Sequence, residues 1–131
     1  MTSEPLVAPQ PKWMTWTGWI LSVLVAGMLT MSGVFKIMPP PEAAEGFAHL
    51  GWPMKLAIAL AVVELGSTLL YLIPATAGLG AILLTGYLGG ATATHVRIEE
   101  AFFMPVILGV VVWIALLLRD PRLRALIPFR K

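Results

Sequence analysis

The chain has 131 residues, of which 58% are hydrophobic and only 12% are charged, with a formal net charge of +2. A soluble domain carries about 25% charged residues, and a core of this size cannot hide such an excess of apolar side chains, so the composition predicts an integral membrane protein. The few scattered charges exclude a basic stripe for nucleic acid, and the absence of cysteine excludes disulfides, thiolate metal sites and dithiol redox chemistry by the chain itself.

The N-terminal part of the chain predicts a tail, a membrane span and a short surface helix. Residues 1–15 are polar and rich in proline, which is typical of a flexible tail. The apolar stretch at about 17–35 predicts a first span, and prolines 39–41 end it because proline lacks the backbone donor that a helix needs. Residues 42–51 mix apolar and polar side chains and predict a short interfacial helix.

Three further apolar stretches follow, at about 56–73, 78–95 and 102–118. At ~1.5 Å per residue, each is about long enough to cross a ~30 Å hydrocarbon core as a helix. The last stretch has no ionisable residue, so we expect it to form a wall that faces lipid or a partner. The fold prediction is an all-α, four-helix transmembrane bundle over residues 16–118, with a short interfacial helix after the first span.

The basic tail at 119–131 predicts the orientation of the bundle. Four spans put both termini on the same side of the membrane. That side carries six basic residues and the other side three, and basic residues collect on the cytoplasmic side. We therefore expect both termini in the cytoplasm, in a bacterial inner membrane, with the tail against anionic lipid headgroups.

Glu64 stands near the middle of the second apolar stretch and constrains the whole assembly. A charged side chain near the bilayer midplane costs about 3 kcal/mol or more, so Glu64 should face other helices. The helix face that carries Glu64 holds mostly small or polar residues before and after it at helical spacing, whereas the opposite face is bulky and apolar. The face expected to point inward holds Ala57, Leu60, Ala61, Glu64, Ser67, Thr68 and Tyr71.

Five side chains predict a polar pocket within the bundle: Lys36, Glu64, Tyr87, His95 and Arg97. In one interpretation Glu64 accepts a proton, His95 carries a second proton, and Lys36 supplies positive charge for an anion or a quinone oxygen. In the other interpretation, Ser or Thr hydroxyls and an ion pair with Lys36 hold Glu64 and fix the helix register. The residues alone leave both interpretations open.

The third apolar stretch is unusually rich in glycine. Small residues let membrane helices approach closely, and Gly86 and Gly90 form a G-x-x-x-G pair. Together with Gly89 they predict a helix-packing face.

Short motifs spread over roughly residues 17–129 resemble the DoxX-like family of small four-span membrane proteins. The motifs are MSGVFK at 31–36, GFAHLG at 46–51, VEL at 63–65, YLIP at 71–74, LTGYLGGA at 84–91, THVR at 94–97, PVILG at 105–109 and LRDPR at 118–122. The resemblance implies a four-helix membrane bundle. It also implies a link to redox systems, since the family takes its name from a membrane subunit of a thiosulfate:quinone oxidoreductase.

Three functions of different classes stay open. The first, which the resemblance favours, is an auxiliary subunit without a cofactor of its own that docks to a membrane or peripheral oxidoreductase through residues 102–118. The second is a small enzyme or binding protein that takes a quinone or another small molecule beside Glu64, so catalysis itself is left open. The third is a carrier or channel, which requires a homo-oligomer because four short spans leave one copy little room for alternating access. No metal is expected, since His49, His95 and Glu64 lack the spacing of a metal site.

Overall fold

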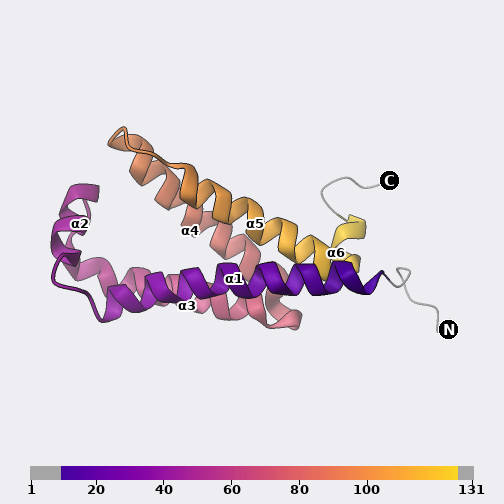
Figure 1. The fold of residues 1–131 in the computed structure, drawn as a ribbon. Helices are drawn as coiled ribbons and strands as arrows, with labels where there is room; N and C mark the ends of the chain where they lie inside the picture. Colours follow the sequence, from indigo (N-terminus) through magenta and orange to yellow (C-terminus); the bar gives the residue numbers. More distant parts are fainter. Residues whose placement is uncertain (1–9, 127–131) are drawn as a thin grey trace.

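The computed structural model describes residues 10–126, and the structural statements below concern these residues. They fold into helices without strands, so the predicted all-α bundle is confirmed (Figure 1). Four helices are long: α1 (Lys12–Ile37), α3 (Ala57–Leu72), α4 (Ala77–Arg97) and α5 (Phe103–Arg119). The short elements are α2 (Ala43–Leu50), which lies where the short surface helix was predicted, η1 (Met54–Leu56), η2 (Pro74–Thr76) and α6 (Pro121–Leu126).

Two segments of the described chain, Lys12–Ile37 and Met54–Leu72, are long and apolar enough to cross a membrane. Helix α5 is a shorter apolar helix, and α4 lies where the third span was predicted but carries many glycines and threonines. The count of four spans therefore stays a prediction. Helix α1 also begins earlier than the predicted span, so residues 12–15 are helical rather than part of a tail, while positions 1–9 lie outside the described residues.

The four long helices close into a ring in which α1 contacts α3 and α5, and α4 contacts the same two helices. The pair α4–α5 diverges from the pair α1–α3 toward the end that carries α2 (Figure 1). Helix α5 is not merely an outer wall, as its sequence had suggested, because its inner face supplies fully buried side chains to the core. These are Val112, Ala115 and Leu116.

Tyr71 anchors the end of the bundle where the two helix pairs converge. Its side chain is fully buried, and its hydroxyl donates to the backbone carbonyl of Val112 at 2.7 Å and lies 3.3 Å from the Ser22 hydroxyl. Gly80 faces it, and a Cβ at this position would lie 2.2 Å from the backbone nitrogen of Tyr71. Only glycine therefore lets α4 approach α3 this closely.

Arg119 is buried at the same end, where the sequence had predicted the start of an exposed basic tail. Its guanidinium donates to the carbonyl of Tyr71, and its central carbon lies 4.2 Å from the ring centroid of Trp19 and 4.6 Å from that of Tyr71. Stacking on aromatic faces and the negative end of α3 both favour the cation there. A Cβ on Gly18 would lie 2.6 Å from the Arg119 backbone nitrogen, so this glycine lets α1 and α5 meet.

The prediction that Gly86, Gly89 and Gly90 form a close-packing face is wrong. No described atom lies within 4 Å of a Cβ built on any of them, because this part of α4 lies where the helix pairs diverge. The glycines within the long helices that do permit close contacts are Gly18, Gly33 and Gly80.

We expect Gly80→Ala to lower the free energy of unfolding by about 1–3 kcal/mol, because the added methyl group overlaps backbone atoms that cannot move aside. Gly86→Ala is the matched control, since the same change on the same helix points into open space. Thermal unfolding in detergent, followed by circular dichroism, compares the two. An unchanged melting temperature in Gly80→Ala would contradict the close contact.

Candidate functional site

Helix α3 presents its polar face to the other helices, as the sequence predicted. Glu64 is 1% exposed, and the rest of the predicted face is buried except Leu60, which is half-buried. The opposite face is exposed at Ile58, Val62, Val63 and Leu69. The pattern of small and polar residues at helical spacing thus identified the inward face correctly.

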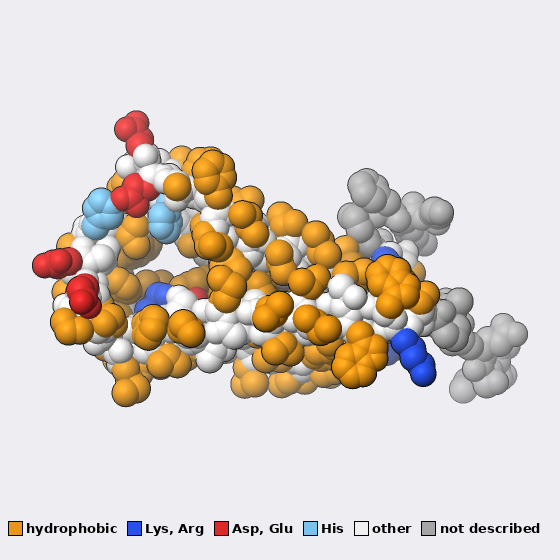
Figure 2. Space-filling view, viewed as in Figure 1, with side chains coloured by type: hydrophobic (Ala, Val, Ile, Leu, Met, Phe, Trp, Pro, Cys, Tyr) orange, Lys and Arg blue, Asp and Glu red, His pale blue; other side chains and the backbone are white. Residues whose placement is uncertain are grey.

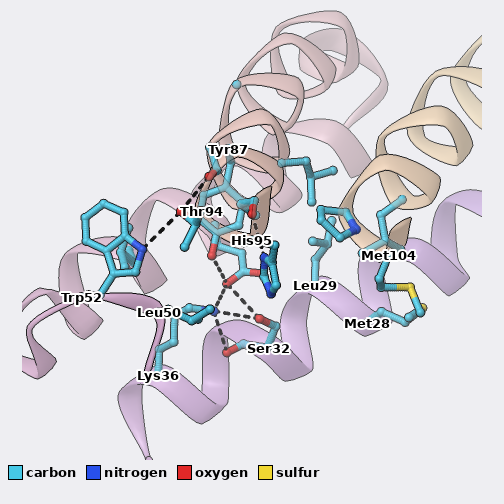
Figure 3. Close-up of a pocket in the computed structure, with 18 of the residues that line it drawn as sticks. Met28, Leu29, Ser32, Lys36, Leu50, Trp52, Tyr87, Thr94, His95 and Met104 are labelled. Atoms are coloured by element: carbon cyan, nitrogen blue, oxygen red, sulfur yellow. Dashed lines mark hydrogen bonds and ion pairs between the residues drawn. The ribbon is translucent and has the colours of Figure 1, made fainter. Parts of the chain in front are cut away.

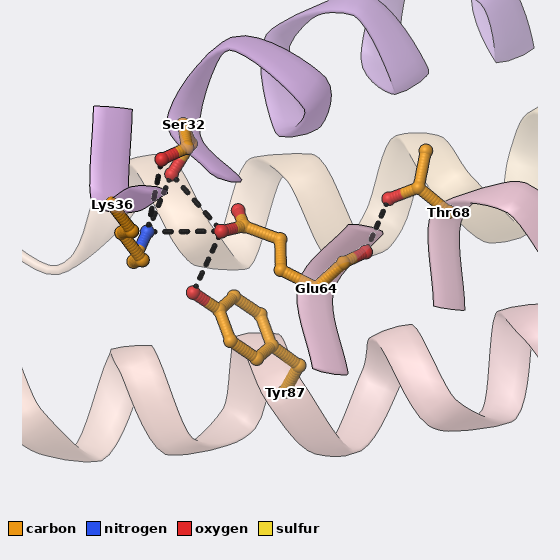
Figure 4. A network of polar contacts seen from close by, with 5 residues as sticks. All are labelled: Ser32, Lys36, Glu64, Thr68 and Tyr87. Carbon is orange, nitrogen blue, oxygen red and sulfur yellow. Dashed lines mark hydrogen bonds and ion pairs between the residues drawn. The ribbon is translucent and has the colours of Figure 1, made fainter. Parts of the chain in front are cut away.

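Three hydrogen-bond donors converge on one oxygen of Glu64 (Figure 4). Its Oε1 accepts from Lys36 Nζ at 2.9 Å, from the Tyr87 hydroxyl at 3.0 Å and from the Ser32 hydroxyl at 3.3 Å. Lys36 and Ser32 belong to α1 and Tyr87 to α4, so the carboxylate joins three helices. The ion pair places a cation against a buried anion, which offsets the cost of removing both from water.

Ser32 is a site residue that the search for ionisable groups missed. It lies one helical turn before Lys36, and Lys36 Nζ donates to its hydroxyl at 2.8 Å. That spacing puts both side chains on one face of α1, which was the available signal. The other hydroxyls beside Glu64 serve their own helix instead, since Ser67 donates to the Val63 carbonyl and Thr68 to the Glu64 carbonyl.

A cavity of about 580 Å³ lies beside this network, where the helix pairs diverge (Figure 3). It opens as a hollow in the surface, with a basic side chain inside and the two histidines at its edge (Figure 2). Its volume falls within the range of small-molecule sites, about 300–1,000 Å³. Apart from the network, its walls are mostly apolar and come from α1, α3, α4, α5 and the segment from α2 to η1. They include Met28, Leu29, Phe47, Leu50, Leu60, Leu88, Met104 and Leu108.

His95 lines the cavity, as predicted, while its ring Nδ1 contacts the carbonyl of Ala91 at 2.8 Å. Two further lining residues were not predicted: Trp52, whose ring nitrogen donates to the Thr94 hydroxyl at 3.3 Å, and Thr94 itself. Their bond joins the segment after α2 to α4 across the cavity wall (Figure 3). A bond between two such distant positions carries no local sequence signal.

Arg97 does not line the cavity, so its assignment to the polar pocket is corrected. Its guanidinium donates to the carbonyl of Leu50, where Gly51 ends α2 with a left-handed backbone at φ 83°. The ring Nε2 of His49 forms a hydrogen bond with the Glu100 carboxylate in the loop after α4. These two contacts hold α2 against the far end of α4, and the cavity wall at Phe47 and Leu50 depends on that position.

The model of a family described as DoxX-like matches residues 20–116, well over half of the chain. The chain belongs to the DoxX-like family. This family is membrane-associated, which supports the membrane protein that the composition predicts. The matched region of this DoxX-like chain contains the whole Glu64 network and every residue of the cavity wall. Searches of curated proteins and of solved structures each found no match.

The arrangement can hold the polar end of a small molecule. A carboxylate, a phenol and an imidazole line one wall of an apolar space, and an ammonium group balances the carboxylate charge. Such a set can also move a proton, because carboxylate and imidazole are the usual acceptors in proton transfer. Among the described residues, no group of three metal-ligand side chains comes together.

We expect Lys36→Met to destabilise the fold by about 3 kcal/mol, because it leaves a buried carboxylate without its cation. The double variant Lys36→Met/Glu64→Gln should recover part of this loss, which gives a coupling energy in a double-mutant cycle. Unfolding by SDS in mixed micelles measures both. Lys55→Met, at an exposed lysine, is the control and should leave stability unchanged. A coupling energy of zero would remove the ion pair as a determinant of the fold.

Proposed function

We propose that this DoxX-like chain is an integral membrane protein that binds a small, largely apolar molecule in the cavity beside Glu64. The observation that carries the proposal is a buried carboxylate, 1% exposed, on the wall of a ligand-sized apolar cavity. A few convergent polar groups on apolar walls are typical of small-molecule sites. The apolar walls contribute affinity, and Glu64, Tyr87 and His95 orient the polar end. A quinone in its reduced, hydroxyl-bearing quinol form is one molecule of this kind.

A role as auxiliary subunit of a membrane redox system is the second proposal, and the family resemblance is its main support. The outer face of α5 adds a specific observation, because it is apolar and exposed at Val106, Ile107, Val110 and Ile114. An oxidoreductase could dock there without disturbing the bundle. The two proposals are compatible, since a redox-active molecule in the cavity would give the partner its substrate.

The carrier or channel alternative receives no support from the described residues. The cavity occupies the half of the bundle near α2. The other half is filled by Tyr71, Leu84, Val112 and Leu116, which are at most 1% exposed. Transport through one copy would require this packed half to open.

We further propose that the protein lies in a bacterial inner membrane. Both ends of the described chain then face the cytoplasm, and α2 lies on the outer side of the membrane. Acidic residues collect at the α2 end (Figure 2), namely Glu42, Glu45, Glu99 and Glu100. Among the described residues, three basic side chains lie toward the α2 end and four toward the other end: Lys36, Lys55 and Arg97 against Lys12, Arg119, Arg122 and Arg124. The sequence adds Arg130 and Lys131 after the last of these, which gives six basic residues against three, and the positive-inside rule counts basic residues.

Because the chain has no cysteine, single cysteines can report the orientation. We expect a membrane-impermeant maleimide to label Glu45→Cys in intact cells, and to label Arg122→Cys only after the cells are permeabilised. Both positions are exposed, so burial does not limit the reaction at either one. The reverse pattern would overturn the proposed orientation.

Filling the cavity should abolish binding. Gly90 lines the cavity and a Cβ there meets open space, so Gly90→Leu puts a branched side chain into the cavity. Gly89→Leu is the matched control. Gly89 directly precedes Gly90 but lines the groove between α4 and α5 instead of the cavity. Native mass spectrometry of protein extracted gently from its own membranes gives the bound molecule and its mass. We expect it in the wild type and in Gly89→Leu but not in Gly90→Leu; equal retention in all three would contradict the proposal.

A further inference from the structure

We infer that the molecule bound in the cavity presents a hydroxyl group to the protein, as a hydrogen-bond donor, and carries its apolar part out between α1 and α2. This inference rests on the proposed binding function and specifies the chemistry of the ligand. It follows from which side-chain donors and acceptors of the cavity wall are already used.

The donors around Glu64 are all used within the network. The ammonium group of Lys36 has three hydrogens and three acceptors, namely Glu64 Oε1 and the hydroxyl and carbonyl of Ser32. The hydroxyls of Ser32 and Tyr87 both donate to the same Oε1. Glu64 Oε2 accepts no hydrogen bond from the described residues (Figure 4). A carboxylate has about four acceptor positions, so this oxygen needs a donor from outside the protein.

The donors at the other side of the wall are used as well. The ring nitrogen of Trp52 donates to the Thr94 hydroxyl, which itself donates to the carbonyl of Gly90 at 2.8 Å. The partner of His95 Nδ1 is the carbonyl of Ala91, which can only accept, so Nδ1 carries the proton. In the neutral ring Nε2 is then an acceptor, and no described residue donates to it.

With His95 in its neutral form, the cavity offers its ligand two strong side-chain acceptors, Glu64 Oε2 and His95 Nε2. A ligand whose polar atoms only accept would leave both unpaired in an apolar space, which is costly. A cationic amine would donate, but Lys36 lies 2.9 Å from the same carboxylate and repels a second cation. A neutral hydroxyl group has one hydrogen, which it donates to one of these acceptors without adding charge.

The apolar part of the ligand has a continuous place to lie. A groove of about 770 Å³ runs between α1 and α2, and most of its lining is apolar. Five residues line both the groove and the cavity, which makes the two spaces neighbours across a shared wall: Met28, Ser32, Lys36, Phe47 and Leu50. A molecule with its hydroxyl at Glu64 can thus extend its apolar chain over this wall toward lipid.

A matched pair of probes tests the inference. 4-Octylphenol and its methyl ether have nearly the same shape, but only the phenol donates a hydrogen bond. We expect the phenol to bind the wild-type protein in lipid nanodiscs about tenfold more tightly in an equilibrium assay with radiolabelled probes. Because the phenol has one hydroxyl hydrogen, the preference should shrink to about twofold or less in Glu64→Gln or in His95→Phe, whichever removes the acceptor that it uses. The control Thr92→Val, on the groove between α4 and α5, should keep the preference.

Retention of the full preference in both Glu64→Gln and His95→Phe would overturn the inference. If Glu64→Gln does not fold, the comparison of phenol and ether in the wild type still tests it, and His95→Phe remains available because the described bond of His95 is to its own helix. Equal binding of phenol and ether in the wild type, with both lost in Gly90→Leu, would overturn the hydroxyl assignment and leave the binding function intact. Tighter binding of the cationic 4-octylbenzylamine would also overturn it. If neither probe binds and no molecule is retained from native membranes, the proposed function itself fails.

Discussion

The ion pair between Lys36 and Glu64 is the interaction on which the arrangement of the helices depends. A carboxylate in an apolar bundle must have a partner, because lipid offers neither a counter-charge nor a hydrogen-bond donor. Lys36 supplies the charge from the last turn of α1, and Tyr87 adds a hydroxyl from α4. The pair therefore fixes the position of α1 along the axis of α3. At the C-terminal end of α3, Tyr71 and Arg119 make the corresponding contacts to α1 and α5, so the middle and the C-terminal end of this helix are both held by polar bonds in an otherwise apolar bundle.

The contrast between the two ends of the bundle explains why a cavity exists. Where the helix pairs converge, Gly80 and Gly18 let backbones meet and large side chains fill the space between them. Toward α2 the pairs diverge, and the wall of α4 is built from small residues such as Gly86, Gly90 and Ala91, which leave the intervening volume empty. A row of glycines in a membrane helix is usually a contact surface. Here most of that row provides volume for the cavity, and this also accounts for the low apolar content of α4.

The features that were predictable from the sequence are those with a local period or a simple balance of charge. The long helices, the inward face of Glu64 and the presence of Lys36, Tyr87 and His95 at one site all follow from helical spacing and from the cost of a buried charge. Arg119 was misinterpreted because a basic residue at the end of an apolar stretch is typical of an orientation signal, and only the packing of Trp19 and Tyr71 distinguishes the two cases. Arg97 was misplaced because its position depends on how α2 folds back onto α4, a contact between residues far apart in the chain.

The two interpretations that the sequence left open for Glu64, a functional pocket or a structural ion pair, describe the same atoms. Oε1 accepts the three hydrogen bonds that join α3 to α1 and α4 at this site, and Oε2 accepts none from the described residues. One oxygen of the carboxylate thus stabilises the bundle while the other stays free for a ligand. Lys36 has a similar double position, since it pairs with Glu64 and also borders both the cavity and the groove between α1 and α2. In the proposed binding mode, a ligand that enters along this groove passes the ion pair without breaking it, because Lys36 uses neither Glu64 Oε2 nor His95 Nε2. The contacts to Oε1 offset the cost of burying the carboxylate, so the site is preorganised before any ligand arrives.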